Sequence, residues 1–225
     1  MFFNFAIIQQ KIMRQRNYII LMADIVGSSS YNQKQLFYDF RTLIEDINED
    51  HPDRFLSPMT ITLGDEFQSI LKNLNVALAT IFDIEEKLIT MNKSFKFRYV
   101  LVEGKIDTPI NPEIAYGMMG SGLTTARAIL NSEKKSRHRF NIELKDEKLS
   151  NALNNAYIVA QSFLDHWKCE KDYPVIAEFL AYKDYKLVAN ELSKDPSQIW
   201  KRARTLRIEA YLSIKELIHQ LGELL

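Results

Sequence analysis

The stretch YIILMADIVGSS, residues 18–29, decides how the first half of the chain folds. Its first residues are nearly all apolar, which is typical of a strand buried on both faces. The run stops at Asp24, and Gly27 and a serine cluster follow at once. TITLGDEFQSI (60–70) repeats the pattern, with Asp65 behind Gly64. Both stretches predict a strand that ends in a carboxylate.

The segments around these stretches alternate between extended and helical patterns. Helices are predicted at 31–50, capped by a serine among 28–30, at 73–91 and at 121–131; extended segments are predicted at 18–26, 58–63, 66–71, 95–106 and near 139–144. The first six elements have the order β-α-β-β-α-β, with a tight turn at Gly64-Asp65. This is the ferredoxin-like or palm arrangement.

Strand patterns end near residue 146, and helical patterns continue to the end of the chain. The predicted fold class is therefore α+β, with a palm-like domain at 17–146 and an all-α domain at 147–225.

Composition sets broad limits. The chain has 225 residues, is 46% hydrophobic and 26% charged, and has a formal net charge of zero, so bulk charge favours no particular partner. The single cysteine, Cys169, excludes an internal disulfide and suits a cytoplasmic protein. The apolar N-terminal run is too short to span a membrane. Met13 is an alternative start, which would make residues 1–12 an extension.

The two aspartates have a chemical interpretation. In a palm sheet the first strand lies beside the hairpin, so Asp24 and Asp65 are expected side by side. Paired carboxylates repel, and a divalent cation relieves the repulsion. Mg²⁺ or Mn²⁺ with carboxylate ligands indicates a nucleoside triphosphate site, with Gly27, Ser28 and Ser29 at a helix N-terminus for the phosphates. The structural alternative is that each aspartate only stabilises a turn.

These motifs also resemble a known family. ADIVGSS, TLGDEF, RYVLVEGKI and GMMGSGLTTARAIL resemble motifs of class III nucleotidyl cyclases, and the chain is similar over about 17–220 to the SatD family. The resemblance implies that Asp24, Asp65 and the carbonyl of Ile25 hold metal, and that Arg127 stabilises the transition state. Leu123 and Ile61 replace the asparagine and base-reading lysine of the cyclases. GDEF also resembles diguanylate cyclases, to which the first strand is less similar.

The tail KLVANELSKDPSQIWKRARTLRIEAYLSIKELI (186–218) resembles a helix-turn-helix. Asp195, with a proline after it, predicts a capped start for the second helix. Residues expected to contact DNA are Ser197, Gln198, Lys201, Arg202, Arg204 and Arg207. A solvated basic face is the alternative.

Three functional hypotheses follow. The first is a nucleotide-responsive, DNA-binding regulator on a degenerate cyclase-like domain. The second is an active Mg²⁺- or Mn²⁺-dependent nucleotidyl cyclase or polymerase, and the third is a non-catalytic interaction module. Leu123 and Ile61 favour the first over the second, because neither side chain can hydrogen-bond ribose or base. A homodimer is expected, as in class III cyclases.

Overall fold

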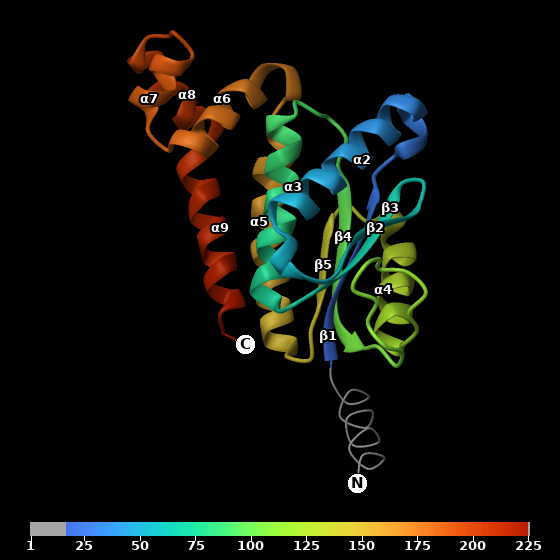
Figure 1. Cartoon of the computed structure of the whole chain (residues 1–225). Coiled ribbons are helices and arrows are strands. Elements are labelled where there is room, and N and C mark those ends of the chain that lie inside the picture. Colours follow the sequence, from blue (N-terminus) through green and yellow to red (C-terminus); the bar gives the residue numbers. More distant parts are fainter. Residues whose placement is uncertain (1–16, 225) are drawn as a thin grey trace.

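The computed structural model describes residues 17–224 and contains one mixed sheet with helices on both faces (Figure 1). The strands are β1 (Asn17–Ile25), β2 (Phe55–Leu63), β3 (Glu66–Leu71), β4 (Phe97–Lys105) and β5 (Phe140–Glu143). The α-helices are α2 (Gln33–Asp50), α3 (Leu74–Thr90), α4 (Ser121–Ser132), α5 (Glu147–His166), α6 (Cys169–Tyr182), α7 (Tyr185–Glu191), α8 (Pro196–Leu206) and α9 (Ile208–Gly222). The α+β class is confirmed.

The sheet has the order β2-β3-β1-β4-β5. β1 lies at its centre and pairs antiparallel with β3 and β4, while β5 extends the sheet parallel to β4. Seven of the nine positions of β1 are buried, which explains why its sequence is almost continuously apolar. The order β1-α2-β2-β3-α3-β4 is the predicted one.

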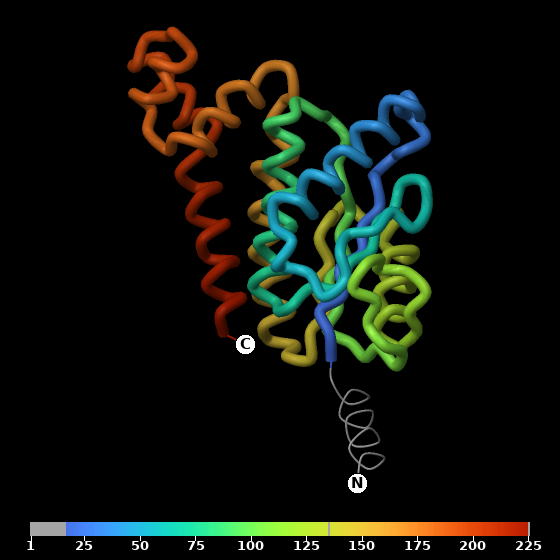
Figure 2. Tube along the Cα trace, in the orientation of Figure 1, coloured from blue at the N-terminus to red at the C-terminus, as the bar shows by residue number. Residues whose placement is uncertain are grey.

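Helices cover the two faces of the sheet unequally. α2, α3 and α5 pack on one face, and α4 together with the segment 106–120 covers the other (Figures 1 and 2). Side chains alternate between the faces along each strand, so odd-numbered residues of β4 face α3 and α5, and even-numbered ones face α4. One strand can therefore serve two different sites.

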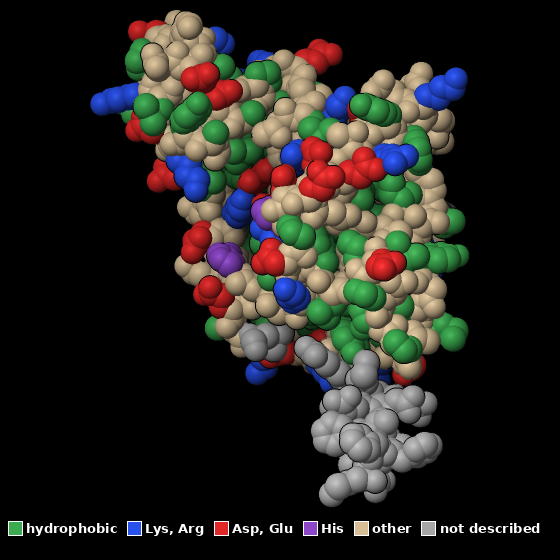
Figure 3. Space-filling view, viewed as in Figure 1, with side chains coloured by type: hydrophobic (Ala, Val, Ile, Leu, Met, Phe, Trp, Pro, Cys, Tyr) green, Lys and Arg blue, Asp and Glu red, His purple; other side chains and the backbone are tan. Residues whose placement is uncertain are grey.

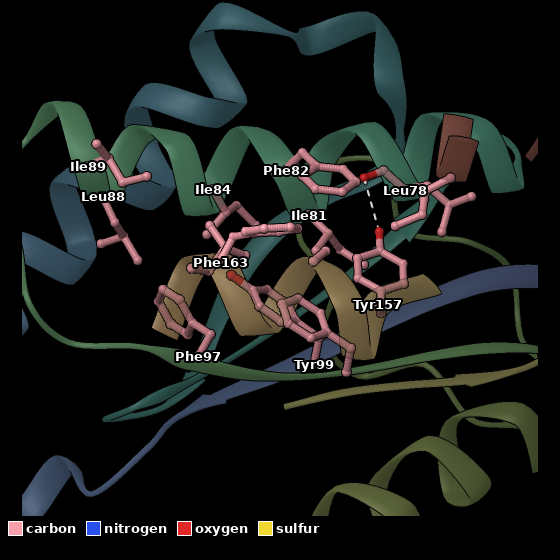
Figure 4. Close-up of a cluster of buried hydrophobic side chains, with 14 of the residues drawn as sticks. Leu78, Ile81, Phe82, Ile84, Leu88, Ile89, Phe97, Tyr99, Tyr157 and Phe163 are labelled. Carbon is pink, nitrogen blue, oxygen red and sulfur yellow. Dashed lines mark hydrogen bonds between the residues drawn. The ribbon is translucent and has the colours of Figure 1, made fainter. Parts of the chain in front are cut away.

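Aromatic side chains fill the core between the sheet and α3 and α5 (Figure 4). Tyr157 of α5 stacks on Phe82 of α3, with ring centroids 5.6 Å apart, and on Phe140 at 4.7 Å. Its hydroxyl donates to the carbonyl of Leu78 at 3.4 Å. Burial raises the pKa of Tyr157 well above its usual value, so this side chain stays neutral and joins both layers.

Two glycines allow α4 to lie directly on β4. A Cβ atom on Gly122 of α4 would come within 2.8 Å of the Cα of Gly104 on β4. Larger residues at either position would push the helix away from the sheet. The two glycines therefore set the distance between α4 and the sheet, and with it the position of Arg127.

The start of α2 differs from the prediction. The N-cap is Asn32, whose side chain accepts a hydrogen bond from the amide of Gln35 at 3.2 Å. Ser28–Ser30 form a separate 3₁₀ turn, because Gly27 turns the chain with φ +65° and its carbonyl accepts from the Ser30 hydroxyl. The prediction of a serine cap was wrong, and the amides of residues 27–29 do not begin α2.

The tail shares its core with the sheet. α5 packs on β5, and α9 packs on α5 and α3. Trp167 donates its ring N–H to the carbonyl of Leu206 at 3.0 Å, and the buried Tyr211 donates to Glu86 at 2.9 Å. Buried residues of the sheet and the tail form one continuous hydrophobic cluster. The division into domains at 146 stays a prediction.

Two short helices, α7 and α8, pack on each other in the predicted helix-turn-helix segment. Asp195 caps α8 by accepting from the amides of Ser197 and Gln198, and Pro196 is the first helical residue, as predicted. Ser193 adopts φ +51° in the turn. A helix-turn-helix function for this segment stays a prediction.

The structure gives no sign of a transmembrane helix. In the part of the chain that it describes, every helix is too short or too polar to cross a bilayer. The predictions about residues 1–12 and Met13 lie outside that part.

Candidate functional site

Three charged side chains stand in a row where β1 ends. Asp24 pairs with Glu66 on β3 and with Arg98 on β4. Directly opposite residues project to the same face of a sheet, so all three lie on the α4 face. This row places two carboxylates and a guanidinium together on one face of the sheet.

Asp24 and Arg98 form a buried ion pair. Nη1 of Arg98 donates to Oδ1 of Asp24 at 2.9 Å and to Oδ2 at 3.0 Å, and the two residues are 5% and 6% exposed. Nη2 donates to the carbonyl of Lys134 at 3.1 Å. Nε of Arg98 is buried and has no hydrogen-bond partner among the described residues. Both oxygens of Asp24 are thus already engaged.

Glu66 is held by a second arginine. Nη1 of Arg127, on α4, donates to Oε2 of the buried Glu66. The Arg127 side chain is 32% exposed, so this pair reaches from the sheet to the surface. We call Asp24, Glu66, Arg98 and Arg127 the sheet-end cluster. It combines two carboxylates with two guanidinium groups.

The pKa of Asp24 is raised above its ordinary value of 3.8. Burial is the largest cause, and the nearby carboxylates Glu66 and Asp65 add to it, while Arg98 and Lys134 act in the opposite direction. A buried carboxylate that faces other carboxylates resists ionisation. Arg98 and Lys134 therefore compensate only part of the cost of charging Asp24.

Asp65 lies in the hairpin turn beside the cluster. Its Oδ2 accepts from the Ser28 hydroxyl at 2.6 Å, and its carbonyl accepts from the amide of Ile25 at 2.9 Å. These bonds tie the turn after β1 to the β2–β3 hairpin. A surface hollow of about 640 Å³ lies there. Its lining consists of Ser28, Ser29, Gln33, Leu36, Phe37, Gly64 and Asp65.

The cluster does not fit a bare divalent ion. Mg²⁺ and Mn²⁺ need free carboxylate oxygens. Asp24 is engaged at both oxygens by Arg98, whereas Glu66 and Asp65 are each engaged at one oxygen, by Arg127 and by Ser28. Within residues 17–224, no group of three or more His, Cys, Asp or Glu side chains is arranged to hold a metal ion.

Comparison with known families identifies the chain. A family model for the SatD family matches residues 18–221. The chain belongs to the SatD family. A search of curated proteins found no match.

Solved structures similar to this SatD-family chain have low sequence identity to it. The catalytic core of a rhodopsin-guanylyl cyclase with converted specificity, in complex with ATPαS, is 16% identical with a TM-score of 0.41, over 52% of this chain and 72% of that one. A bacterial light-regulated adenylyl cyclase is 12% identical with a TM-score of 0.40, over 56% and 75%. The guanylyl cyclase Cya2 is 12% identical with a TM-score of 0.35, over 52% and 70%.

The SatD-family chain brings part of the predicted site together. Gly27, Ser28 and Ser29 lie in the turn beside Asp65, and Asp24 and Arg127 belong to the sheet-end cluster. Leu123 is buried against the sheet instead of facing this hollow.

Sequence reasoning missed Arg98 and Glu66. Arg98 interrupts an apolar strand, and an arginine inside FKFRYVLV is a signal of a buried partner, whereas Glu66 is the first residue of its strand. The pattern does not reveal the register that places both residues beside Asp24.

The predicted DNA-contacting residues of the SatD-family chain lie apart from this cluster, on α8 and its end. Ser197, Gln198, Lys201, Arg204 and Arg207 are exposed. Arg202 instead pairs with the buried Asp172 of α6. Arg204 lies over the Trp200 ring at 4.9 Å.

Proposed function

We propose that this chain is a nucleotide-responsive regulator whose cyclase-like part binds a nucleotide without converting it. One observation carries the proposal. Asp24, one of the two predicted metal ligands, has both carboxylate oxygens bonded to Arg98, and the neighbouring carboxylate Glu66 is engaged by Arg127. Two-metal phosphoryl transfer needs such carboxylates as metal ligands, so the arrangement favours binding over turnover.

The hollow beside Ser28 and Asp65 is the proposed ligand site. Its motifs, ADIVGSS and TLGDEF, resemble those with which class III cyclases hold a nucleotide. The Ser29 hydroxyl offers a donor there, since that of Ser28 already donates to Asp65, and Arg127 on α4 is exposed enough to meet a phosphate. Guanidinium groups bind phosphate oxygens in a bidentate manner.

The test incubates the purified protein with each ribonucleoside triphosphate and separates the products by chromatography. We expect no new product, and an increase in melting temperature with at least one nucleotide. A Ser29→Ala variant should reduce that increase while keeping its own melting temperature, because Ser29 is exposed. A cyclic or oligomeric product would instead support the enzyme hypothesis. No product and no stabilisation would favour an interaction module.

A DNA-contacting tail is the second part of the proposal. Exposed donors on or beside α8 come from Ser197, Gln198, Lys201, Arg204 and Arg207. The capped N-terminus of α8 also supports DNA contact. Side chains of both signs occupy the α7–α8 end on the face seen in Figure 3, so a DNA contact would depend on α8 itself.

Lys201→Ala with Arg204→Ala is the appropriate test of DNA contact. Salt-dependent retention of duplex DNA should fall in this variant. Arg202→Ala is unsuitable, because it would leave the buried Asp172 without its partner. Lys194→Ala is the matched control, since Lys194 is exposed in the turn before α8. Equal retention by all three proteins would remove DNA from the proposal.

We also propose that the chain is a homodimer. Light scattering coupled to size-exclusion chromatography measures this directly. A mass near twice 26.3 kDa is the expected result. A mass near 26.3 kDa at all concentrations would contradict it.

A further inference from the structure

We propose that Arg98 is a built-in cation for Asp24, and that the sheet-end cluster takes a phosphorylated ligand without a divalent metal. The part that concerns the ligand rests on the proposed function. The part that concerns the metal does not, since it can be tested on the protein alone.

Asp24 cannot serve Arg98 and a metal ion at the same time. Nη1 of Arg98 is within 3.0 Å of both carboxylate oxygens, so it lies between them, in the direction from which a cation would approach. Both side chains are about 7% exposed, which leaves no room for the water molecules that Mg²⁺ keeps. A metal would have to displace the guanidinium into an apolar surrounding.

Arg98 is also fixed from a second direction. Its Nη2 donates to the carbonyl of Lys134, which lies just after α4. The guanidinium is therefore held between β1 and the 3₁₀ turn η3 (Glu133–Lys135), and cannot swing away without breaking both contacts. This double attachment distinguishes it from a surface ion pair that opens readily.

The charge balance of the cluster also argues against a divalent ion at this site. Two carboxylates, Asp24 and Glu66, face two guanidinium groups, Arg98 and Arg127, so the cluster is formally neutral. A divalent ion would add two positive charges beside these arginines and beside Lys134, which already acts on Asp24. A phosphate group would instead complement Lys134 and Arg127 at the surface.

The unpartnered Nε of Arg98 is a further feature of this site. Buried donors without a partner are uncommon in proteins, and they often mark a place where a ligand or water completes the network. Arg98 thus has a donor to spare in addition to its role as the counter-ion of Asp24.

The metal part is tested by Mn²⁺ titration followed by electron paramagnetic resonance, without nucleotide. The proteins are the wild type, Arg98→Gln, Arg98→Lys and the double variant Asp24→Asn, Arg98→Gln. We expect the wild type to bind Mn²⁺ no more tightly than the double variant, and Arg98→Gln to gain at least about tenfold in affinity, because it frees a carboxylate without its counter-ion. Arg98→Lys keeps the cation and should resemble the wild type.

Circular dichroism shows whether each variant is folded. If Arg98→Gln does not fold, the comparison of wild type, Arg98→Lys and the double variant still shows whether Asp24 binds Mn²⁺ in the presence of Arg98. Tighter Mn²⁺ binding by the wild type than by the double variant would overturn the proposal.

The ligand part is tested by thermal stabilisation of the wild type with each ribonucleoside triphosphate, once in EDTA and once in Mg²⁺. Stabilisation in EDTA equal to that in Mg²⁺ is the expected result. Stabilisation only in Mg²⁺ would overturn this inference and leave the proposed function standing. Stabilisation in neither solution would contradict the proposed function, while the Mn²⁺ titration would still decide the role of Arg98.

Discussion

The sheet carries two buried charge clusters at the same end of β4, one on each face, and they differ in how completely they are bonded. On the α3–α5 face, Arg139 pairs with Glu85 and Asp165, and Lys96 also pairs with Asp165; we call these four the helix-face cluster. Nη1 and Nη2 of Arg139 donate to both oxygens of Glu85 at 2.9 and 3.0 Å, and Nε donates to Asp165 at 3.1 Å. The helix-face cluster leaves no guanidinium nitrogen unused.

The sheet-end cluster is less complete. Nε of Arg98 has no partner among the described residues, and Arg127 reaches the surface. Adjacent residues of β4 serve the two clusters, since the Arg98 side chain faces α4, while Tyr99 faces α3 and donates to Glu85 at 2.9 Å. A closed network stabilises the fold, and an open one beside a hollow is suited to a ligand.

Removing the central arginine of each cluster should give different losses of stability. Arg139→Met leaves the buried Glu85 without a cationic partner, and should lower the free energy of unfolding by about 3–5 kcal/mol. Urea denaturation at pH 7 measures it, with Glu85→Gln, Arg139→Met as the control that removes both charges. A loss below about 1 kcal/mol, the range of exposed pairs, would show that this network is not structural.

Arg98→Met should lower the free energy of unfolding by less, about 1.5–3 kcal/mol, which is the range of a hydrogen bond to a charged group. The reason is the raised pKa of Asp24, which lets this carboxyl take up a proton once its partner is gone. The same urea titration, repeated at pH 5, should show a smaller loss than at pH 7. A loss larger than that of Arg139→Met would reverse the comparison.

The two aspartates should titrate on opposite sides of the ordinary value of 3.8. Burial raises the pKa of Asp24. Burial acts on Asp165 in the same direction, but Arg139 and Lys96 outweigh it and lower its pKa. Carbon-detected NMR titration of the carboxyl groups checks both. Two midpoints on the same side of 3.8 would contradict the assignment of the clusters.

The stability effects of these titrations have opposite signs. For Asp24 the folded state holds the proton more tightly, so its contribution is present below pH 3.8 and is lost as the pH rises through the folded-state pKa. For Asp165 the contribution is present above 3.8 and is lost as the pH falls through the folded-state pKa.

The smallest effect is expected for Lys96→Ala. Lys96 pairs with Asp165 at 2.8 Å, but both side chains are about 30% exposed. Such a pair contributes about 0.2–1 kcal/mol. Urea denaturation should therefore separate this variant clearly from Arg139→Met. A loss as large as that of Arg139→Met would mean that Lys96 is as important to the network as Arg139.

The sequence was informative about elements and less so about contacts between them. The apolar run before Asp24 and the Gly64-Asp65 turn predicted the central strand and the hairpin, because local patterns determine both. The predicted carboxylate pair was incomplete, because strand register places Glu66 and not Asp65 directly opposite Asp24. Register depends on packing across the sheet, which no local pattern shows.

Two further predictions, the serine cap of α2 and the DNA-contacting role of Arg202, differ from what the structure shows. The serine cap failed because Ser28–Ser30 form their own 3₁₀ turn, and Asn32, a cap as good as serine, directly precedes the first residue of α2. Arg202 was predicted to contact DNA together with the other basic residues of α8, but it turns inward and pairs with Asp172 of α6. Such a partner lies 30 residues away in the sequence, beyond the reach of helical spacing.

The most direct test is NMR of the arginine Nε–Hε groups during a nucleotide titration. The account predicts that the signals of Arg98 and Arg127 shift with a ribonucleoside triphosphate, in EDTA, while the signal of Arg139 stays in place. Arg139 is the internal control, because its guanidinium is fully bonded on the opposite face of the sheet. Stabilisation of the protein by a nucleotide with no shift at Arg98 and Arg127 would contradict the account.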